Sequence, residues 1–403
     1  MGFLIDKRND IIMGKIPLMN LTRQYQNIKD DINKKVLDVL SSGQYIMGEN
    51  VKSFEKEFAE YMGVKYAIGV GNGTDALHIA LLACNIRPED EIITCGMSFF
   101  ATAEAISIVG AKPIFVDCCD DTYVLDHRQI EKKITSKTKA IVVVHLYGQC
   151  VDMDEICKIA KKYNLKVIED TAQAAGARYK NKYAGTLGDV GCISFFPTKN
   201  IGCAGDGGII LTDDEAIARI CKAYRVHGSG YDGKFAYEFF HDIKLENECD
   251  FGDNLPKYFN FLIGCNSRLD EIQAAMLRIK LPFLESWNSR RREIANYYNE
   301  NIKNDLIKKP IVSKNCEHIY YVYVIMVKER DRFREFLAAN DIATGIYFPI
   351  PLHLQEVYKN LGYKKGDLPN VERLANCGVA IPMFPELTED ELKKIVKVIN
   401  DFN

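Results

Sequence analysis

The chain has 403 residues, of which 47% are hydrophobic and 27% are charged. This composition is typical of soluble globular proteins, and the length predicts one large domain plus a smaller one. The formal net charge of -3 argues against nucleic acid as the main partner, because nucleic-acid binding favours a basic face.

From residue 66 onward, short β-rich runs alternate with helical patterns. We expect strands at 67–70, 91–94, 113–116, 140–145 and 167–170, and helices at 74–83, 101–109, 127–134 and 152–163. Apolar strands separated by helices predict a parallel sheet that is covered on both faces. Ligands collect beyond the carboxyl ends of such strands, which is where Gly71, His145 and Asp170 fall.

The pattern changes after residue 200. Residues 229–257 are rich in glycine, acidic and aromatic residues and have no clean period, so we expect a long loop or insertion there. Helical patterning resumes at Ser267 and continues to Ile302, broken by Pro282.

A second α/β unit follows near the carboxyl end of the chain. We expect a strand at 320–327 and helices at 330–340 and 389–401. The chain is thus predicted to be of class α/β. Its predicted parts are an N-terminal arm (1–28), a large domain that contains the insertion (29–285) and a small C-terminal domain (286–403).

A glycine-rich turn lies between the first expected strand and helix, in the run Gly69-Val70-Gly71-Asn72-Gly73-Thr74-Asp75. Free N–H groups at a helix N-terminus bind anions, so a phosphate is a natural ligand here. A plain turn with an N-cap threonine explains the segment equally well. It is not a Walker A loop, because no Gly-Lys-Ser/Thr follows, and its glycines miss the G-x-G-x-x-G spacing of dinucleotide folds.

An acid ends the short apolar strand Val167-Ile168-Glu169-Asp170. Pyridoxal phosphate (PLP) works as an electron sink while its pyridine nitrogen stays protonated, and an aspartate beside that nitrogen holds the proton. A lone aspartate at such a place is more often a helix cap or a turn former. Gln173 reaches the oxygen of the ring if the segment turns after the strand.

One lysine lies in an unusual setting, the apolar and glycine-rich run from Ser194 to Gly208. Most lysines are solvated surface residues, and that is the ordinary interpretation of Lys199 as well. Two phenylalanines and a proline precede it, however, and a desolvated amine has the lowered pKa that Schiff-base formation needs. The Ser194 hydroxyl is a candidate for binding the same phosphate as the glycine turn.

Three further side chains are weaker candidates. Phe99 lies where a strand passes into a helix and can stack on a flat cofactor, although a phenylalanine pair is more often part of the core. His145 and His353 are expected to be structural or substrate-orienting, because no metal-like cluster surrounds them in the sequence. No metal site is therefore expected.

Cysteine usage and apolar runs bear on the compartment. The thirteen cysteines are scattered and contain no C-x-x-C pair, which supports neither a zinc site nor a disulfide framework and is typical of a reducing cytoplasm. No apolar run approaches the roughly 20 residues that span a bilayer. We expect a soluble cytoplasmic protein with no membrane partner.

Taken together, these residues resemble the DegT/StrS family of PLP-dependent sugar aminotransferases, which have the fold-type I architecture of aspartate aminotransferase. The likeness follows nearly the whole chain in order. It is carried by the segments Leu21–Tyr25, Ser42–Gly48, Gly73–Leu77, Val144–Gln149, Glu169–Ala174, Ser194–Gly208, Asn266–Ala275, Tyr347–Gln355 and Pro382–Leu387. The resemblance implies a large domain with a mixed, mostly parallel sheet and a smaller C-terminal α/β domain.

The resemblance also implies roles for individual residues. Lys199 matches the lysine that forms the Schiff base with PLP, and Asp170 matches the acid at the pyridine nitrogen. Gln173 matches the residue at the ring hydroxyl, and Phe99 matches the stacking aromatic. Some family members are dehydratases with histidine in place of this lysine, so Lys199 favours transamination.

The phosphate of PLP is implied to have ligands from two subunits. Gly73, the amides of Thr74 and Asp75, and the Ser194 hydroxyl match its contacts within one chain. Asn266 matches an asparagine that reaches the phosphate from the neighbouring subunit, which implies a homodimer with two shared active sites. Tyr45 and His353 are the residues that we expect to contact the substrate.

The sequence around the lysine, Ser-Phe-Phe-Pro-Thr-Lys-Asn followed by Gly-Asp-Gly-Gly, resembles that of the family branch that aminates C3 of nucleotide-linked keto sugars. We therefore expect glutamate as amino donor and a 3-keto-deoxy sugar linked to dTDP or UDP as acceptor. The product would be an amino sugar for a surface polysaccharide or a secondary metabolite. Residues 229–257 make the chain longer than compact members, so a 4-keto sugar nucleotide, a keto-inositol and a non-nucleotide keto sugar stay open as acceptors.

Two rival functions come from other classes. One is a PLP-binding regulatory protein without catalytic activity, which the missing DNA-binding domain and basic face disfavour. The other is a nicotinamide dehydrogenase, which the glycine spacing disfavours.

Overall fold

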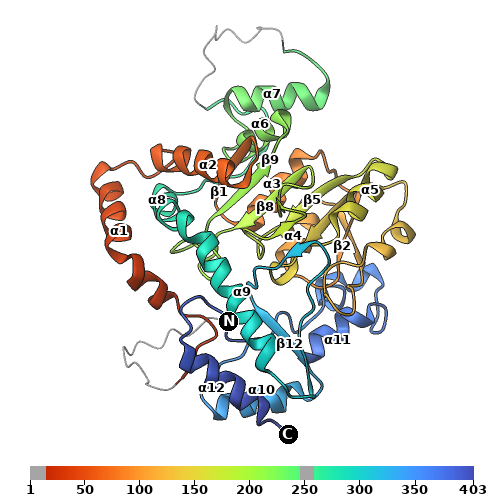
Figure 1. Cartoon of the computed structure of the whole chain (residues 1–403). Helices are drawn as coiled ribbons and strands as arrows, with labels where there is room; N and C mark the ends of the chain where they lie inside the picture. Colours follow the sequence, from red (N-terminus) through yellow and green to blue (C-terminus); the bar gives the residue numbers. More distant parts are fainter. Residues whose placement is uncertain (1–14, 246–257) are drawn as a thin grey trace.

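A seven-stranded sheet forms the centre of the larger part of the molecule (Figure 1). The computed structural model describes residues 15–245 and 258–403. The strands of this sheet are β1 (Tyr66–Val70), β2 (Glu91–Cys95), β3 (Lys112–Val116), β4 (Thr138–Val144), β5 (Lys166–Asp170), β8 (Val190–Ser194) and β9 (Gly208–Thr212). Their order is β1-β9-β8-β5-β4-β2-β3, and β9 runs antiparallel to both of its neighbours. The expected mixed, mostly parallel sheet is confirmed.

Helices cover both faces of this sheet, as the continuous apolar strands predict. They and the remaining helices are α1 (Leu21–Ser42), α2 (Glu49–Met62), α3 (Gly73–Ala83), α4 (Ala101–Ile108), α5 (Met153–Tyr163), α6 (Glu215–Tyr224), α7 (Gly230–His241), α8 (Glu271–Lys280), α9 (Leu284–Asn301), α10 (Arg330–Ala339), α11 (Pro369–Cys377) and α12 (Glu389–Asn400). Alternate residues of β4 enter different apolar clusters. Ala140 and Val142 pack with α3, α4 and α6, whereas Ile141 and Val143 pack with α5 and α11.

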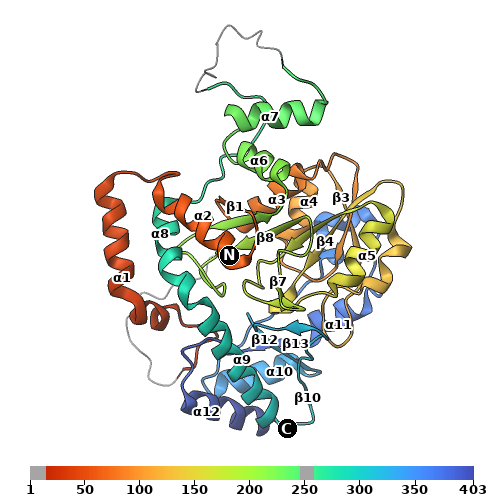
Figure 2. The same ribbon diagram turned by 45° about the horizontal axis from the view of Figure 1, so that its top comes forward.

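A smaller sheet lies below the large one in Figure 2. Its strands are β10 (Ile307–Lys308), β12 (Tyr323–Val327) and β13 (Gly378–Ile381), in the order β10-β12-β13. A third set of short strands is formed by β6 (Arg178–Tyr179), β7 (Lys182–Tyr183) and β11 (Cys316–Glu317). Helix α9 begins at Leu284 and leads into the part with the smaller sheet. This change of sheet supports the predicted boundary at residue 285, which stays a prediction.

The expectation of a loop over 229–257 is wrong for its first part, because α7 lies there and projects from the body above α6 (Figure 1). Glycines at 230 and 233 hide the helical period in the sequence. Gly233 is required by close packing, since a Cβ there would lie 2.3 Å from the carbonyl oxygen of Gly228. Ala236 is buried and Phe235 partly buried in the cluster that α6 shares. Residues 246–257 of the expected loop lie outside the described residues.

Two other expectations differ in detail. The helix expected at 127–134 is a pair of 3-10 turns, because Ile130 is its only buried side chain and provides no apolar face for a longer helix. Helix α1 begins within the predicted N-terminal arm, at Leu21, and has a kink at Ile28, the last residue of that arm; the boundary itself stays a prediction. Residues 1–14 of the arm lie outside the described residues. None of the helices in the described ranges has the length and apolar character that crossing a bilayer requires.

One buried asparagine of α9 fastens two loops of the large sheet to each other. Asn288 is fully buried, and its Nδ2 donates to the carbonyl oxygen of Ala175 at 3.1 Å. Its Oδ1 accepts from Nδ2 of Asn200 at 2.7 Å. Gly176 allows this approach, because its φ is +92° and a Cβ there would lie 2.4 Å from Asn288 Nδ2. The loop after β5 and the loop that contains Lys199 thus share one anchor.

Replacing this anchor is expected to destabilise the protein. Asn288→Ala leaves two buried groups without partners, each worth roughly 1–3 kcal/mol, so we expect a fall of about 3 kcal/mol in the free energy of unfolding. Urea unfolding followed by fluorescence measures it. Asn296→Ala, at an exposed position of the same helix, is the matched control. Equal midpoints for the two variants would contradict the anchor.

Candidate active site

The carboxyl end of β5 carries a buried acid. Asp170 is 5% exposed, and its Oδ2 accepts a hydrogen bond from Thr102 Oγ1 at 2.6 Å. Its Oδ1 accepts from the backbone N–H of Ala172 at 3.1 Å. Within residues 15–245 and 258–403, no cation forms an ion pair with this carboxylate. Since a buried charge needs a partner, the carboxylate is poised to receive a positively charged group from a ligand.

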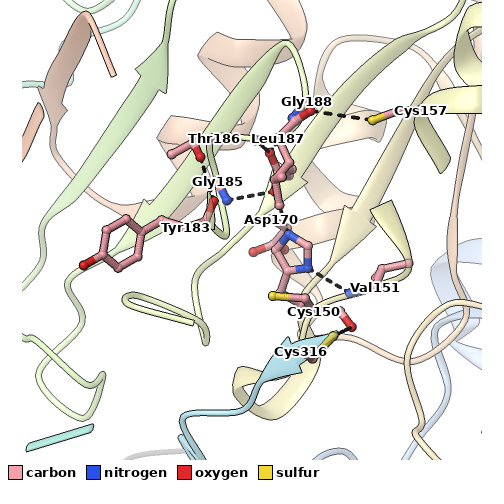
Figure 3. A network of polar contacts seen from close by, with 12 residues as sticks. Cys150, Val151, Cys157, Asp170, Tyr183, Gly185, Thr186, Leu187, Gly188 and Cys316 are labelled. Atoms are coloured by element: carbon pink, nitrogen blue, oxygen red, sulfur yellow. Dashed lines mark hydrogen bonds and ion pairs between the residues drawn. The ribbon is translucent and has the colours of Figure 1, made fainter. Parts of the chain in front are cut away.

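The residue before it, Glu169, is fully buried and belongs to a separate polar network, of which Figure 3 labels Gly185, Leu187, Gly188 and Val151. Its two carboxylate oxygens accept backbone N–H bonds of 2.6–2.8 Å from Gly185, Leu187 and Gly188. It also pairs with Nε2 of His145 at 2.8 Å. His145 Nδ1 accepts from the backbone N–H of Val151, so the ring proton lies on Nε2 and is donated to Glu169. This places His145 in a structural role and fixes the end of the strand that carries Asp170.

A chain of contacts leads from Gln173 across to the smaller sheet. The Oε1 of Gln173 accepts from the backbone N–H of Tyr147 at 2.8 Å, and Gln173 is 5% exposed. The carbonyl oxygen of Tyr147 accepts in turn from the backbone N–H of Tyr321 at 2.9 Å. Tyr321 is buried and lies just before β12. Backbone pairing therefore carries this aromatic ring to the carboxyl edge of the large sheet.

Lys199 meets that ring. Its Nζ lies 4.7 Å from the centroid of Tyr321, a cation–π contact, and its side chain is half-buried. The neighbouring Thr198 hydroxyl is 3.3 Å from the Tyr321 hydroxyl. In the described part of the chain, no carboxylate forms an ion pair with Lys199. The contacts thus join Lys199 to Gln173 through Tyr321 and Tyr147, and leave its amine without an anionic partner.

The glycine turn forms the third part of the site. Helix α3 begins at Gly73, and its N-cap is Asn72 rather than the threonine that the alternative interpretation invoked. A Cβ on Gly73 would lie 2.6 Å from Cβ of Ser194, so glycine lets the helix N-terminus approach the Ser194 hydroxyl. The amides of Gly73 and Thr74 have no intrahelical acceptor, as at every helix start. Together with Ser194 they form a cradle for an anion.

Asp75 differs from the expectation. Its amide donates to Oδ1 of Asn72 at 2.8 Å and is therefore engaged by the cap. Its carboxylate accepts from the Ser267 hydroxyl at 2.6 Å, and the same hydroxyl accepts from the backbone N–H of Gly71 at 2.9 Å. Asp75 therefore holds the turn in shape, and the free amides are those of Gly73 and Thr74.

Phe99 lies beside this group with an open ring. It is 58% exposed, and its centroid is 5.8 Å from that of Phe348. Thr102, three residues along, bonds to Asp170, which brings the start of α4 to the same edge of the sheet. An exposed aromatic face at this place can cover a flat ring.

The structure does not bring the remaining predicted residues into this group. Asn266 is exposed, although the adjacent Ser267 supports the turn. Tyr45 is 46% exposed, and its hydroxyl donates to the carbonyl oxygen of Leu40. His353 is buried, with Nε2 3.2 Å from a Glu372 oxygen. Burial lowers the pKa of His353 against the opposing effect of Glu372. Contacts of these three with PLP or substrate stay predictions.

Sequence reasoning missed Thr102, Tyr147 and Tyr321 as parts of the site. Thr102 lies three residues from Phe99, but nothing local in the sequence indicates its bond to a residue 68 positions away. Tyr147 lies in the turn after β4 and Tyr321 just before β12, and a backbone hydrogen bond joins them. Tyr147 takes a φ of +61°, which is uncommon for a residue with a side chain and marks a constrained turn.

These groups fit PLP. The buried Asp170 carboxylate lacks a cation, which a protonated pyridine nitrogen supplies. Lys199 offers an amine for the carbonyl carbon, and the turn with Ser194 offers donors for the phosphate. Three chemically distinct groups of one molecule thus have complementary partners at one edge of the sheet.

Comparison with known proteins agrees with the fit of these residues to PLP. The model of the DegT/DnrJ/EryC1/StrS aminotransferase family matches residues 26–400. A pleiotropic regulatory protein of Geobacillus stearothermophilus is 43% identical over 390 residues, which cover 96% of this chain and 98% of that protein. The dTDP-3-amino-3,6-dideoxy-alpha-D-galactopyranose transaminase of Aneurinibacillus thermoaerophilus is 42% identical over 387 residues, which cover 96% and 99%.

The fold is also that of solved relatives. The crystal structure of S. venezuelae DesV has a TM-score of 0.88 to this chain at 34% identity, covering 96% of this chain and 98% of that one. The expected fold class and family are confirmed. The chain belongs to the DegT/DnrJ/EryC1/StrS aminotransferase family, whose members use PLP as cofactor.

Proposed function

We propose that this aminotransferase moves the amino group of an amino acid, with glutamate as donor, to a 3-keto-deoxy sugar linked to dTDP or UDP. The observation that carries the proposal is that one edge of the sheet holds both an amine without an anionic partner, Lys199, and a buried carboxylate without a cation, Asp170. The name of the Aneurinibacillus relative specifies a 3-amino sugar on dTDP, which supports C3 as the site of amination. The product would serve a surface polysaccharide or a secondary metabolite.

Each residue of the candidate site would contact a different part of PLP. Asp170 would hold the proton on the pyridine nitrogen, and Gln173 would lie at the ring oxygen. Ser194 and the amides of Gly73 and Thr74 would bind the phosphate, while Phe99 would cover the ring. When bound, PLP supplies the electron sink for the transfer. Lys199 Nζ would take the proton from the α-carbon of the amino donor as general base.

The state of assembly and the compartment are part of the proposal. We infer a homodimer in which Asn266 of each subunit completes the partner's phosphate site, which its exposure here supports. A cytoplasmic location is supported by the cysteines of the described residues, which are all free thiols.

A PLP-binding regulator is the second candidate function, and the Geobacillus relative favours it by its name. A regulator has no need of the acid and the base that transamination requires. Steady turnover of glutamate with a keto sugar would therefore eliminate it.

The assignment of Lys199 as the lysine that binds PLP can be tested against a second lysine in the same part of the fold, Lys280. Lys280 is 8% exposed, burial lowers its pKa, and its Nζ donates to the carbonyl oxygen of Gly202 at 2.5 Å. Borohydride reduction of the PLP-loaded enzyme, followed by peptide mass spectrometry, should find the adduct on Lys199. Lys199→Ala should lose the adduct and all measurable turnover. An adduct on Lys280 or on any other lysine contradicts the site.

The phosphate cradle predicts a steric effect. Gly73→Ala pushes α3 away from Ser194, because the new Cβ lies 2.6 Å from Cβ of that serine. We expect the Kd for PLP to rise about tenfold or more, the equivalent of about 1.4 kcal/mol, in fluorescence titrations of the apoprotein. Gly205→Ala is the control, since its nearest neighbour is the flexible end of Gln273 at 3.3 Å. Unchanged binding by both variants would remove Gly73 from the phosphate site.

Substrate choice is tested by a panel of ketones with glutamate as donor. We expect the highest kcat/KM with 3-keto sugar nucleotides of dTDP or UDP. The comparison includes 4-keto sugar nucleotides, keto-inositol and free keto sugars. A 4-keto nucleotide as best acceptor would refute C3 amination, and a keto-inositol or free keto sugar would refute a nucleotide-linked substrate.

A further inference from the structure

Two buried hydroxyls stand behind Asp170. Thr102, in the first turn of α4, is 1% exposed, and Ser98, just before that helix, is 3% exposed. Thr102 Oγ1 lies 2.6 Å from Asp170 Oδ2, and Ser98 Oγ lies 2.7 Å from Thr102 Oγ1. The three side chains form one line of short hydrogen bonds inside the protein.

The protons in this line have a defined direction. An ionised carboxylate only accepts, so Thr102 gives its single hydroxyl proton to Asp170. The Thr102 oxygen is then left as acceptor, and the proton between the two hydroxyls belongs to Ser98. Each bond polarises the next, so the donor strength of Thr102 toward Asp170 is raised by Ser98.

Neither the Ser98 nor the Thr102 hydroxyl caps helix α4. The N-cap of α4 is Phe100, which has no side-chain cap, and no backbone N–H of the helix is bonded by Ser98 or Thr102 among the described contacts. Ser107, further along α4, shows the ordinary alternative, because its Oγ donates to the carbonyl oxygen of Ala103 at 3.0 Å. Thr102 instead directs its proton out of the helix to the strand end.

The consequence for Asp170 is geometric as well as electrostatic. Thr102 holds Oδ2 and the Ala172 N–H holds Oδ1, so both oxygens are fixed and the plane of the carboxylate is set. Hydrogen bonds to an ionised acceptor are about twice as strong as those between neutral groups and favour the charged form. The remaining lone pairs are available to a ligand cation.

We propose that Thr102 is a positioning residue for Asp170, with Ser98 as the donor behind it, and that this pair holds the carboxylate in the orientation in which it meets the pyridine nitrogen of PLP. The inference rests on the proposed role of Asp170. It adds that the line of hydroxyls from Ser98 through Thr102 strengthens the contribution of this acid to cofactor binding.

The experiment compares variants of nearly equal shape. Thr102→Val removes the hydroxyl and keeps the branched side chain, whereas Thr102→Ser keeps the hydroxyl. Thr94→Val is the matched control, because Thr94 is fully buried in β2 and its Oγ1 donates to the carbonyl oxygen of Val142 at 2.9 Å rather than to Asp170. Thr102→Ala is the second hydroxyl-free variant if Thr102→Val does not fold.

Two readouts are measured: the Kd for PLP of the apoprotein by fluorescence titration, and kcat against pH. We expect Thr102→Val to weaken PLP binding about tenfold. The acid limb of its kcat–pH profile should also differ from that of the wild type, whereas the profile of Thr94→Val should not. Thr102→Ser should recover binding to within about threefold, Ser98→Ala should show an intermediate loss, and Thr94→Val should match the wild type.

The variant Asp170→Asn distinguishes a failure of the role proposed for Thr102 from a failure of the role proposed for Asp170. If it weakens PLP binding while Thr102→Val matches Thr94→Val in both readouts, the role of Thr102 is overturned and that of Asp170 stands. If Asp170→Asn leaves PLP binding and the acid limb unchanged, the assignment of Asp170 fails and the proposal for Thr102 fails with it.

Discussion

The candidate active site is organised around one buried carboxylate, Asp170, which has no cation partner among the described residues. Removing an ionised Asp170 from water is unfavourable unless hydrogen bonds and an opposite charge replace the solvent. The described residues supply two donors, Thr102 and the Ala172 amide, and the opposite charge is left to the ligand. A site of this kind favours a ligand that brings a positive charge, such as a protonated ring nitrogen.

The position of β5 in the sheet makes this arrangement possible. Asp170 pairs with Val144 on one side and with Cys192 on the other, so its carboxyl end is flanked by β4 and β8. The turn after β4 presents Tyr147, and Ser194 ends β8. Tyr147 then pairs with Tyr321 next to the smaller sheet, which places that ring at Lys199. Both sheets contribute to one site, so its geometry depends on their contact.

The sequence was informative wherever a regular period or a dense motif was present. The strands and helices around the glycine turn, Asp170 and Lys199 were predicted because apolar runs alternate with helical patterns there. Helix α7 was missed because glycines obscure its period, although Gly233 is required by the backbone of Gly228. Thr102 could not be found, since its role exists only in a contact between residues far apart in the chain.

The buried Lys280 and the half-buried Lys199 show why burial alone does not identify a reactive amine. Lys280 is the more deeply buried, and desolvation lowers its pKa, which would mark it as the nucleophile if that property decided the matter. Its Nζ, however, donates to the Gly202 carbonyl and supports the loop that contains Lys199. Lys199 faces an aromatic ring that offers no acceptor lone pair, so its amine has the freedom to form and release a bond to a carbonyl carbon. The contact that each amine makes, rather than its depth in the protein, separates the structural Lys280 from Lys199, the lysine that we propose to be catalytic.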